Sequence, residues 1–368
     1  MNKLVLGNLV YRPLRSSISV LAIALEVVMM LVITGIMVGS LADTKNRASG
    51  IGADMIVGPS SASFVRGVSG APLSVKVADV LRRLPHVAVA APVAIQVVTG
   101  SAFENIYGID FASFDALRPF HFQAGGPFTG PDQMIIDDYA ARSGKGLKIG
   151  GTTTALNHTF TICGIVDHGK GGRKFVPIET LGQLTGAEGK ASLFYLKTDN
   201  DKNENLVKQE IAAQPGMSQY QVQTIDEWLS MVTQEHLPVV FTTGLNVVIG
   251  IAMIIGFIVI FQSMYTAVLE RTREIGILKS LGATQLTVVN VVLRETALLA
   301  VAGIVVGFAL SFVVKAAISR SFPTLMVVFT PVWMVRATIL SLIGALLGAS
   351  YPAWKAARKD PIDALAYE

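Results

Sequence analysis

The chain has 368 residues, of which 51% are hydrophobic and only 15% are charged, and its mean hydropathy is +0.54. These values are too apolar for a soluble domain of this length, so the composition indicates a membrane protein. The net charge of +4, without a basic cluster in the sequence, argues against a nucleic-acid partner. The single cysteine, Cys163, excludes an intrachain disulfide, and the five histidines lack the spacing of a metal site.

Four stretches are apolar enough, over about 20 residues, to span a bilayer. They are residues 18–39, 239–262, 291–314 and 332–351. Lys and Arg flank the first stretch on its N-terminal side, lie between the second and third, and follow the fourth, so the positive-inside rule places both termini in the cytoplasm. A cleaved signal peptide fits the first stretch less well, because its apolar run exceeds the usual h-region of about 7–15 residues; cleavage would leave three spans.

The long segment between the first two stretches is expected outside the cytoplasm and has the pattern of a mixed α/β domain. Short β-rich runs and helical patches alternate with Gly- and Pro-rich turns. The β-rich runs are 53–57, 87–93, 160–166 and 192–197, and the helical patches are 75–84 and 205–213. The predicted fold class is therefore a membrane α-helical protein with four transmembrane helices and a large extracytoplasmic mixed α/β domain between helices 1 and 2.

A charged amphipathic segment, ERTREIGILKSLGAT at 270–284, separates the second and third stretches. Ile275, Leu278 and Leu281 are spaced to form an apolar stripe on a short helix, which suits contact with a soluble partner. The alternative is a solvated loop, but the like charges of Glu270 and Glu274 at i,i+4 would slightly destabilise an isolated helix. The predicted contact residues are Glu270, Arg271, Arg273, Glu274, Ile275, Gly276, Leu278, Lys279, Leu281 and Gly282.

Glu26 is the acidic residue that lies well inside a predicted span. Insertion of such a charge costs about 2.5–3.5 kcal/mol, so the carboxyl should be protonated, paired or exposed to a wet cavity. Met29 and Met30 follow at i+3 and i+4. One hypothesis is a polar pocket for an amphipathic cargo, in its boldest form a thioether–carboxylate site for a haem-like cargo. The alternative is a protonated Glu26 that bonds a neighbouring helix, with both methionines facing lipid or core.

Three Gly-x-x-x-Gly motifs lie in the predicted spans, at 35–39, 303–307 and 344–348. Small residues at this spacing let helix backbones approach closely in lipid. The motifs could serve a dimer or could pack the four spans of one chain, and the sequence leaves both open.

With these pieces in place, the chain resembles an ABC-transporter permease of the MacB/FtsX-like family. The segment 270–283 is similar to the family's cytoplasmic coupling segment, and the tail 353–368, with Asp360-Pro361 and Ala364-Leu365, is similar to its usual ending. Between the first two spans, four short pieces resemble the MacB-type periplasmic core domain, and they occur in the matching order. These pieces are residues 107–110, 147–151, 160–166 and 175–178.

The resemblance implies a division into domains. The expected parts are a cytoplasmic N-terminus with the first helix at 1–39, a periplasmic core domain at 40–238, a permease domain at 239–352 with its coupling segment at 266–286, and a cytoplasmic tail at 353–368. None of the three Gly-Lys dipeptides belongs to a phosphate-binding loop, so a fused ATPase is not expected.

The resemblance also implies partners and a location. A separate cytoplasmic ATPase subunit would bind ATP and Mg, this chain would need no cofactor of its own, and a second permease copy would complete a homodimer. A periplasmic adaptor and an outer-membrane channel are further candidate partners, and the expected location is the bacterial inner membrane.

The expected function is a permease that couples ATP hydrolysis to export or periplasmic substrate movement by mechanotransmission. Alternatives are a permease that extracts lipoproteins or lipids, and a non-transporting FtsX-type regulator of an envelope enzyme. A stand-alone membrane enzyme is disfavoured, because no nucleophile–base–orienter set stands out in the sequence.

Overall fold

The computed structural model describes residues 13–59, 73–99, 103–143, 147–218, 220–230 and 238–358. Contacts divide the chain into two compact units. The helical unit is Met1–Gly39, Val239–Arg320 and Val327–Glu368, and the α/β unit is Ser40–Pro238 with Ser321–Met326. The tail residues Asp360, Pro361, Ala364 and Leu365, singled out in the sequence, lie outside the described residues.

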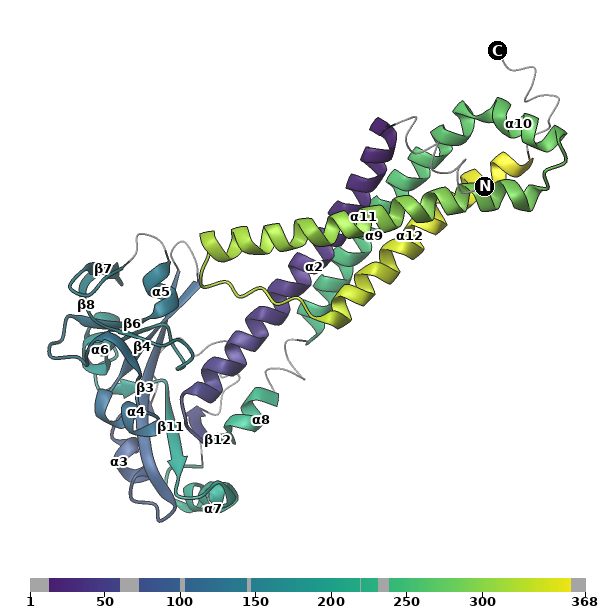
Figure 1. Cartoon of the computed structure of the whole chain (residues 1–368). Helices are drawn as coiled ribbons and strands as arrows, with labels where there is room; N and C mark the ends of the chain where they lie inside the picture. The colour runs from purple at the N-terminus through teal and green to yellow at the C-terminus, as the bar shows by residue number, and fades with distance from the viewer. Residues whose placement is uncertain are drawn as a thin grey trace. The chain divides into compact units, whose positions relative to one another are not determined.

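The helical unit contains the four long apolar helices predicted from the sequence. They are α2 (Pro13–Gly50), α9 (Pro238–Glu270), α11 (Gln285–Ser321) and α12 (Pro331–Arg358). A shorter helix, α10 (Thr272–Ser280), lies between α9 and α11 at one end of the bundle (Figure 1). Each long helix extends beyond its apolar run, because polar residues at a helix end can continue the backbone hydrogen bonding outside the hydrocarbon region.

Small residues let the long helices approach one another within the chain. A Cβ added at Gly303 or Gly307 of α11 would come within 3.0 Å of α2 atoms, and one at Gly348 of α12 would lie 2.9 Å from the Phe257 carbonyl oxygen of α9. At Gly35 of α2 it would meet the Phe329 ring at 2.9 Å. These four motif glycines therefore pack helices and a loop of one chain, which is the second of the two roles considered for the motifs.

The α/β unit is built on one mixed sheet of ten strands with the order β12-β1-β11-β3-β4-β9-β6-β8-β5, in which β7 also pairs with β8. Pairs β4–β9 and β6–β8 are parallel and the other pairs are antiparallel. The strands of this sheet are β1 (Met55–Pro59), β3 (Val87–Thr99), β4 (Phe103–Ile109), β5 (Phe122–Gly125), β6 (Gln133–Asp137), β7 (Thr152–Ala155), β8 (His158–Val166), β9 (Lys174–Pro177), β11 (Leu193–Thr198) and β12 (Tyr220–Thr224).

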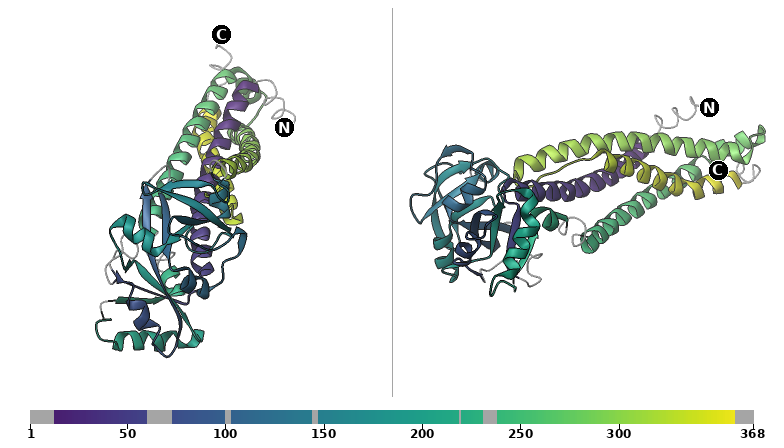
Figure 2. Two further views of the ribbon diagram at one scale, coloured as in Figure 1. Left: turned by 90° about the vertical axis from the view of Figure 1, so that its left-hand side faces the viewer. Right: turned by 90° about the horizontal axis from the view of Figure 1, so that it is seen from below.

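Short helices and a two-stranded ribbon complete this unit (Figures 1 and 2). The helices are α3 (Val77–Leu81), α4 (Phe111–Leu117), α5 (Asp138–Arg142), α6 (Ile178–Thr185), α7 (Glu204–Ala213) and α8 (Ile225–Ser230), with a 3-10 turn η2 (Asp201–Asn203). The ribbon pairs β2 (Leu73–Ser74) with β10 (Lys190–Ala191). The mixed α/β character expected from the sequence is thus confirmed.

Both faces of the large sheet are buried. Along β1, Ile56 packs into one apolar cluster, whereas Met55 and Val57 pack into another. Along β9, Phe175 packs into the same cluster as Ile56, whereas Val176 packs into a third cluster. Because successive strand residues point to opposite faces, apolar side chains are required at consecutive positions, which explains the continuous apolar runs in the sequence.

Candidate functional site

The predicted coupling segment folds as the end of α9, the helix α10 and the turn into α11. Three internal contacts hold α10. Ile275 packs with Val268, Val288 and the alanines at the end of α12. Arg271, just before α10, pairs with Glu295 of α11 at 2.9 Å, and the Lys279 ammonium donates to the Ala357 carbonyl oxygen at 2.9 Å. The helix is therefore fastened to α11 and α12 on one side.

The other side of this segment is exposed. Ile277, Leu278 and Leu281 are 44%, 39% and 80% exposed, and Leu286 at the start of α11 is 74% exposed. Arg273 and Glu274 are exposed between the helix start and these residues. We call Arg273, Glu274, Ile277, Leu278, Leu281 and Leu286 the α10 face. An apolar group rimmed by charges is typical of a protein-binding surface.

A small cavity of about 120 Å³ adjoins the α10 face, between α9, α10 and α11. Its walls are mainly apolar, and the charged groups among its lining residues are Arg271, Glu274 and Glu295. Leu278 lines this cavity while remaining half-exposed. The cavity leaves room beside α10 for an apolar side chain.

The structure gives several members of the predicted contact set a place inside the chain, and their contact with a partner stays a prediction. Of the predicted apolar stripe, Ile275 packs inside the chain, Leu278 is half-exposed, and Leu281 is exposed because α10 ends at Ser280 and Leu281 lies beyond its last turn. Arg271 and Lys279 were predicted as contact residues, yet both are engaged inside the chain. Gly276 is buried, and Gly282 has a φ of +94°, a left-handed conformation that favours glycine at the turn after a helix. Sequence reasoning did not single out Ile277 and Leu286.

Glu26 is buried in the helical unit, where its side chain is 5% exposed. Its carboxyl lies against Gly256 of α9, where an added Cβ would collide with it, and Ser341 of α12 is its polar neighbour. Its Oε1 atom has no hydrogen-bond partner among the described residues. Met30 belongs to the apolar core of the bundle, and Met29 is half-buried. A cargo role for Glu26, Met29 and Met30 stays a prediction.

Comparison with known families covers both units. Residues 16–214 match the MacB-like periplasmic core domain, and residues 246–361 match the FtsX-like permease C-terminal domain. Two crystal structures also match part of the chain. The periplasmic region of MacB from Actinobacillus actinomycetemcomitans is 15% identical, covering 48% of this chain and 91% of that one, with a TM-score of 0.39. The extracellular domain of YknZ from Gram-positive bacteria is 16% identical, covering 46% of this chain and 98% of that one, with a TM-score of 0.35.

Relatives align over part of the chain. The uncharacterized ABC transporter permease YknZ of Bacillus subtilis is 33% identical over 153 residues, which is 40% of this chain and 37% of YknZ. The macrolide export ATP-binding/permease protein MacB of Rhodopirellula baltica is 33% identical over 151 residues, which is 40% of this chain and 21% of that protein. MacB of Escherichia coli K12 is 35% identical over 124 residues, which is 34% of this chain and 19% of that protein. The matches therefore span about a third of YknZ and about a fifth of the MacB proteins.

Proposed function

The chain belongs to the MacB/FtsX-like family of ABC transporter permeases, and on that premise we propose that it is a membrane subunit driven by a separate cytoplasmic ATPase. In this proposal the ATPase binds ATP and Mg, docks on the α10 face, and moves substrate by a conformational change that the permease transmits. The chain itself carries no catalytic site, acts as a homodimer in the inner membrane of a bacterium, and has both termini in the cytoplasm. An adaptor and an outer-membrane channel would complete the system.

The α10 face carries this proposal. Leu281 is 80% exposed beside the exposed polar side chains of Ser280 and Thr284, so burial of this turn in lipid is unfavourable. Contact with a soluble protein would instead remove the apolar groups from water, while Arg273 and Glu274 fix the register at the rim. The internal contacts of Arg271 and Lys279 hold α10 in place, so a push on its exposed side would act on α11 and α12.

The test separates docking from folding. In the Leu281→Asp variant, association with the ATPase should weaken about tenfold or more, because a central apolar anchor is lost. Reversal of both charges, Arg273→Glu with Glu274→Arg, should weaken association less and alter its salt dependence. The measurement is co-purification and titration of the ATPase against the permease in lipid nanodiscs, together with ATP turnover.

Leu206→Asp is the matched control, because Leu206 is also an exposed leucine, 46% exposed, but lies on α7 of the α/β unit. Wild-type affinity in the Leu281→Asp variant would refute docking on the α10 face. Docking together with ATP-dependent cargo movement would support the transporter; docking that instead changes the activity of an envelope hydrolase would support the regulatory alternative. Release of lipoproteins from the membrane would support the extraction alternative.

A further inference from the structure

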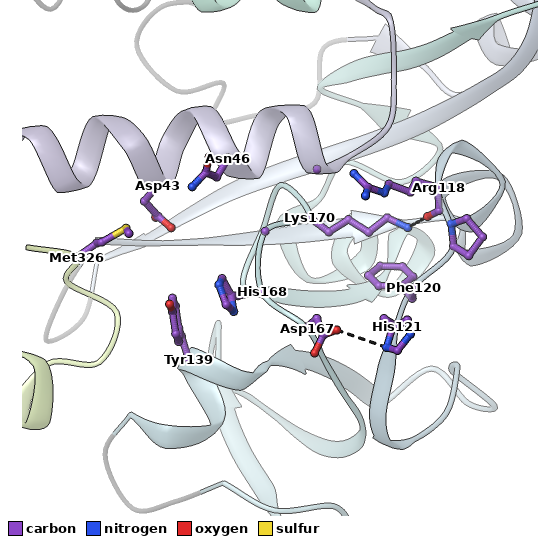
Figure 3. A pocket seen from close by; sticks show the side chains of 13 residues that line it. Asp43, Asn46, Arg118, Phe120, His121, Tyr139, Asp167, His168, Lys170 and Met326 are labelled. Atoms are coloured by element: carbon purple, nitrogen blue, oxygen red, sulfur yellow. Dashed lines mark hydrogen bonds and ion pairs between the residues drawn. The ribbon is translucent and has the colours of Figure 1, made fainter. Parts of the chain in front are cut away.

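A second cavity, of about 460 Å³, lies within the α/β unit between the C-terminal part of α2 and the loop that follows β8 (Figure 3). This volume is within the range of about 300–1,000 Å³ that small-molecule sites occupy. Its lining combines charged, aromatic and apolar side chains.

Lys170 is the unusual member of this lining, because its side chain is only 6% exposed. Its ammonium donates to the carbonyl oxygen of Arg118 and lies 3.8 Å from the centre of the Phe120 ring. In the described part of the chain no carboxylate forms an ion pair with it. Burial lowers the pKa of Lys170 to about 8, Asp115 opposes this shift and Arg118 adds to it. A buried lysine without a counter-ion is costly, and a bound anion would offset that cost.

Arg118 supplies a second positive charge beside Lys170. Its side chain is exposed, and no hydrogen bond or ion pair of its guanidinium is found within the described residues. A guanidinium that faces a cavity can bind a carboxylate or phosphate through two parallel hydrogen bonds. Figure 3 shows Arg118, Lys170 and Phe120 together at one end of the cavity.

Of the two carboxylates that line the cavity, Asp43 is paired with arginines and Asp167 has only neutral or weakly charged partners. Asp43 accepts ion pairs from Arg47 at 3.0 Å and from Arg173 at 2.9 Å. Asp167 lies 3.4 Å from His121 and accepts a hydrogen bond from Gln123. Arg118 and Lys170 therefore bring two positive charges to the cavity against the one carboxylate, Asp167, that has no arginine partner.

The opposite end of the cavity provides flat apolar surface. The Tyr139 and His168 rings stack with their centres 4.0 Å apart and an angle of 16° between their planes. His168 is held by Asp138 at 2.9 Å, which fixes the orientation of the stack. Both rings line the cavity, and Met326 adds a flexible apolar side chain near them (Figure 3).

We propose that this cavity binds an amphiphilic organic anion, with its phosphate or carboxylate between Arg118 and Lys170 and its apolar body toward the Tyr139–His168 stack. The site shares no residue with the α10 face and its binding needs no ATPase. This proposal can therefore be tested separately from the proposed transport function.

The test is calorimetric titration of the full chain in nanodiscs with phenyl phosphate, inorganic phosphate and phenol. Phenyl phosphate should bind more tightly than inorganic phosphate or phenol, because it contacts both the positive end and the aromatic end of the cavity. Arg118→Gln and Lys170→Met should each weaken phenyl phosphate binding about tenfold or more, since each removes a charge-assisted contact. Replacement of phenyl by octyl phosphate distinguishes a flat ring from a lipid-like chain as the body of the anion.

Arg83→Gln is the matched control, because Arg83 is exposed in the same unit but does not line the cavity. Should Lys170→Met unfold the unit, as judged by circular dichroism, the exposed Arg118 variant still decides the question. The proposal is overturned by absence of phenyl phosphate binding at millimolar concentration, or by equal binding in wild type, Arg118→Gln and Arg83→Gln.

Discussion

The ion pair between Arg271 and Glu295 is a structural role that the sequence did not predict. Both side chains are nearly buried, 11% and 6% exposed, and they connect the start of α10 to α11. In the sequence Arg271 is one of several charges in an amphipathic segment, while Glu295 is a polar interruption of an apolar run. Their partnership joins positions 24 residues apart and depends on the fold of the intervening helix and turn.

Removal of one partner should destabilise the helical unit. Glu295→Gln leaves the Arg271 charge without this carboxylate, and loss of one member of a buried pair costs about 3–5 kcal/mol. We expect a lower unfolding temperature in detergent and weaker protection of α10 in hydrogen exchange. The double variant Arg271→Met with Glu295→Leu should recover much of the loss, because both charges are then absent. Equal stability of wild type and Glu295→Gln would contradict a structural role.

Lys170 should make the stability of the α/β unit depend on pH. Its folded pKa of about 8 lies below the ordinary value of 10.5, so the unfolded chain binds more protons between these values. Stability therefore rises with pH from about 8 to 10.5 and is reduced at all lower pH. In Lys170→Met this gain should vanish, so the unfolding temperatures of variant and wild type should converge as pH rises. A constant difference across this range would contradict the buried, unpaired lysine.

At the scale of helices and strands, local sequence patterns predicted which elements form. Contacts between residues far apart in the sequence determine where each element lies. Apolar runs of about 20 residues sufficed to predict α2, α9, α11 and α12, because that signal is contained in each helix. The end of α10 before Leu281 was not predicted, because a helix end depends on the turn at Gly282. The sheet order and the cavity beside Lys170 were not predictable, since they join residues from 43 to 326 that no local period relates.

The contact between α2 and α11 supports a prediction about glycine. A Cβ at Gly307 would lie 2.8 Å from the Val27 Cβ and 3.0 Å from the Ala24 carbonyl oxygen, whereas one at Gly250 of α9 would meet nothing within 4 Å. Both Gly→Ala changes gain helix propensity of about 0.5–1 kcal/mol. Gly307→Ala should nevertheless lower the unfolding temperature, because overpacking costs about 1–3 kcal/mol. If Gly250→Ala lowered the unfolding temperature and Gly307→Ala did not, the Gly307 contact would not be made.

At the scale of the whole molecule, the topology can be tested by labelling. In a Cys163→Ser background, cysteines placed at the exposed positions Glu188 and Ser280 should react with a membrane-impermeant maleimide from opposite sides. The Cys163→Ser change removes the one native thiol, which is itself poorly reactive because burial raises the pKa of Cys163 to about 11 and thiolate is the reactive form. Labelling of both positions in intact cells would refute the orientation proposed from the positive-inside rule.

The helix α2 offers the sharpest test of transmitted motion. It runs from Pro13 to Gly50 as one helix, and the boundary between the two units falls after its Gly39. A proline at position 41 would remove a backbone hydrogen bond and kink or break the helix, at a cost of about 3 kcal/mol. If α2 transmits motion, Leu41→Pro should leave ATPase docking and basal ATP turnover intact while cargo movement falls sharply. Leu41→Ala, which preserves the helix, should behave as wild type in the same nanodisc and vesicle assays. Full cargo movement in Leu41→Pro would show that the helical continuity of α2 is not required for function.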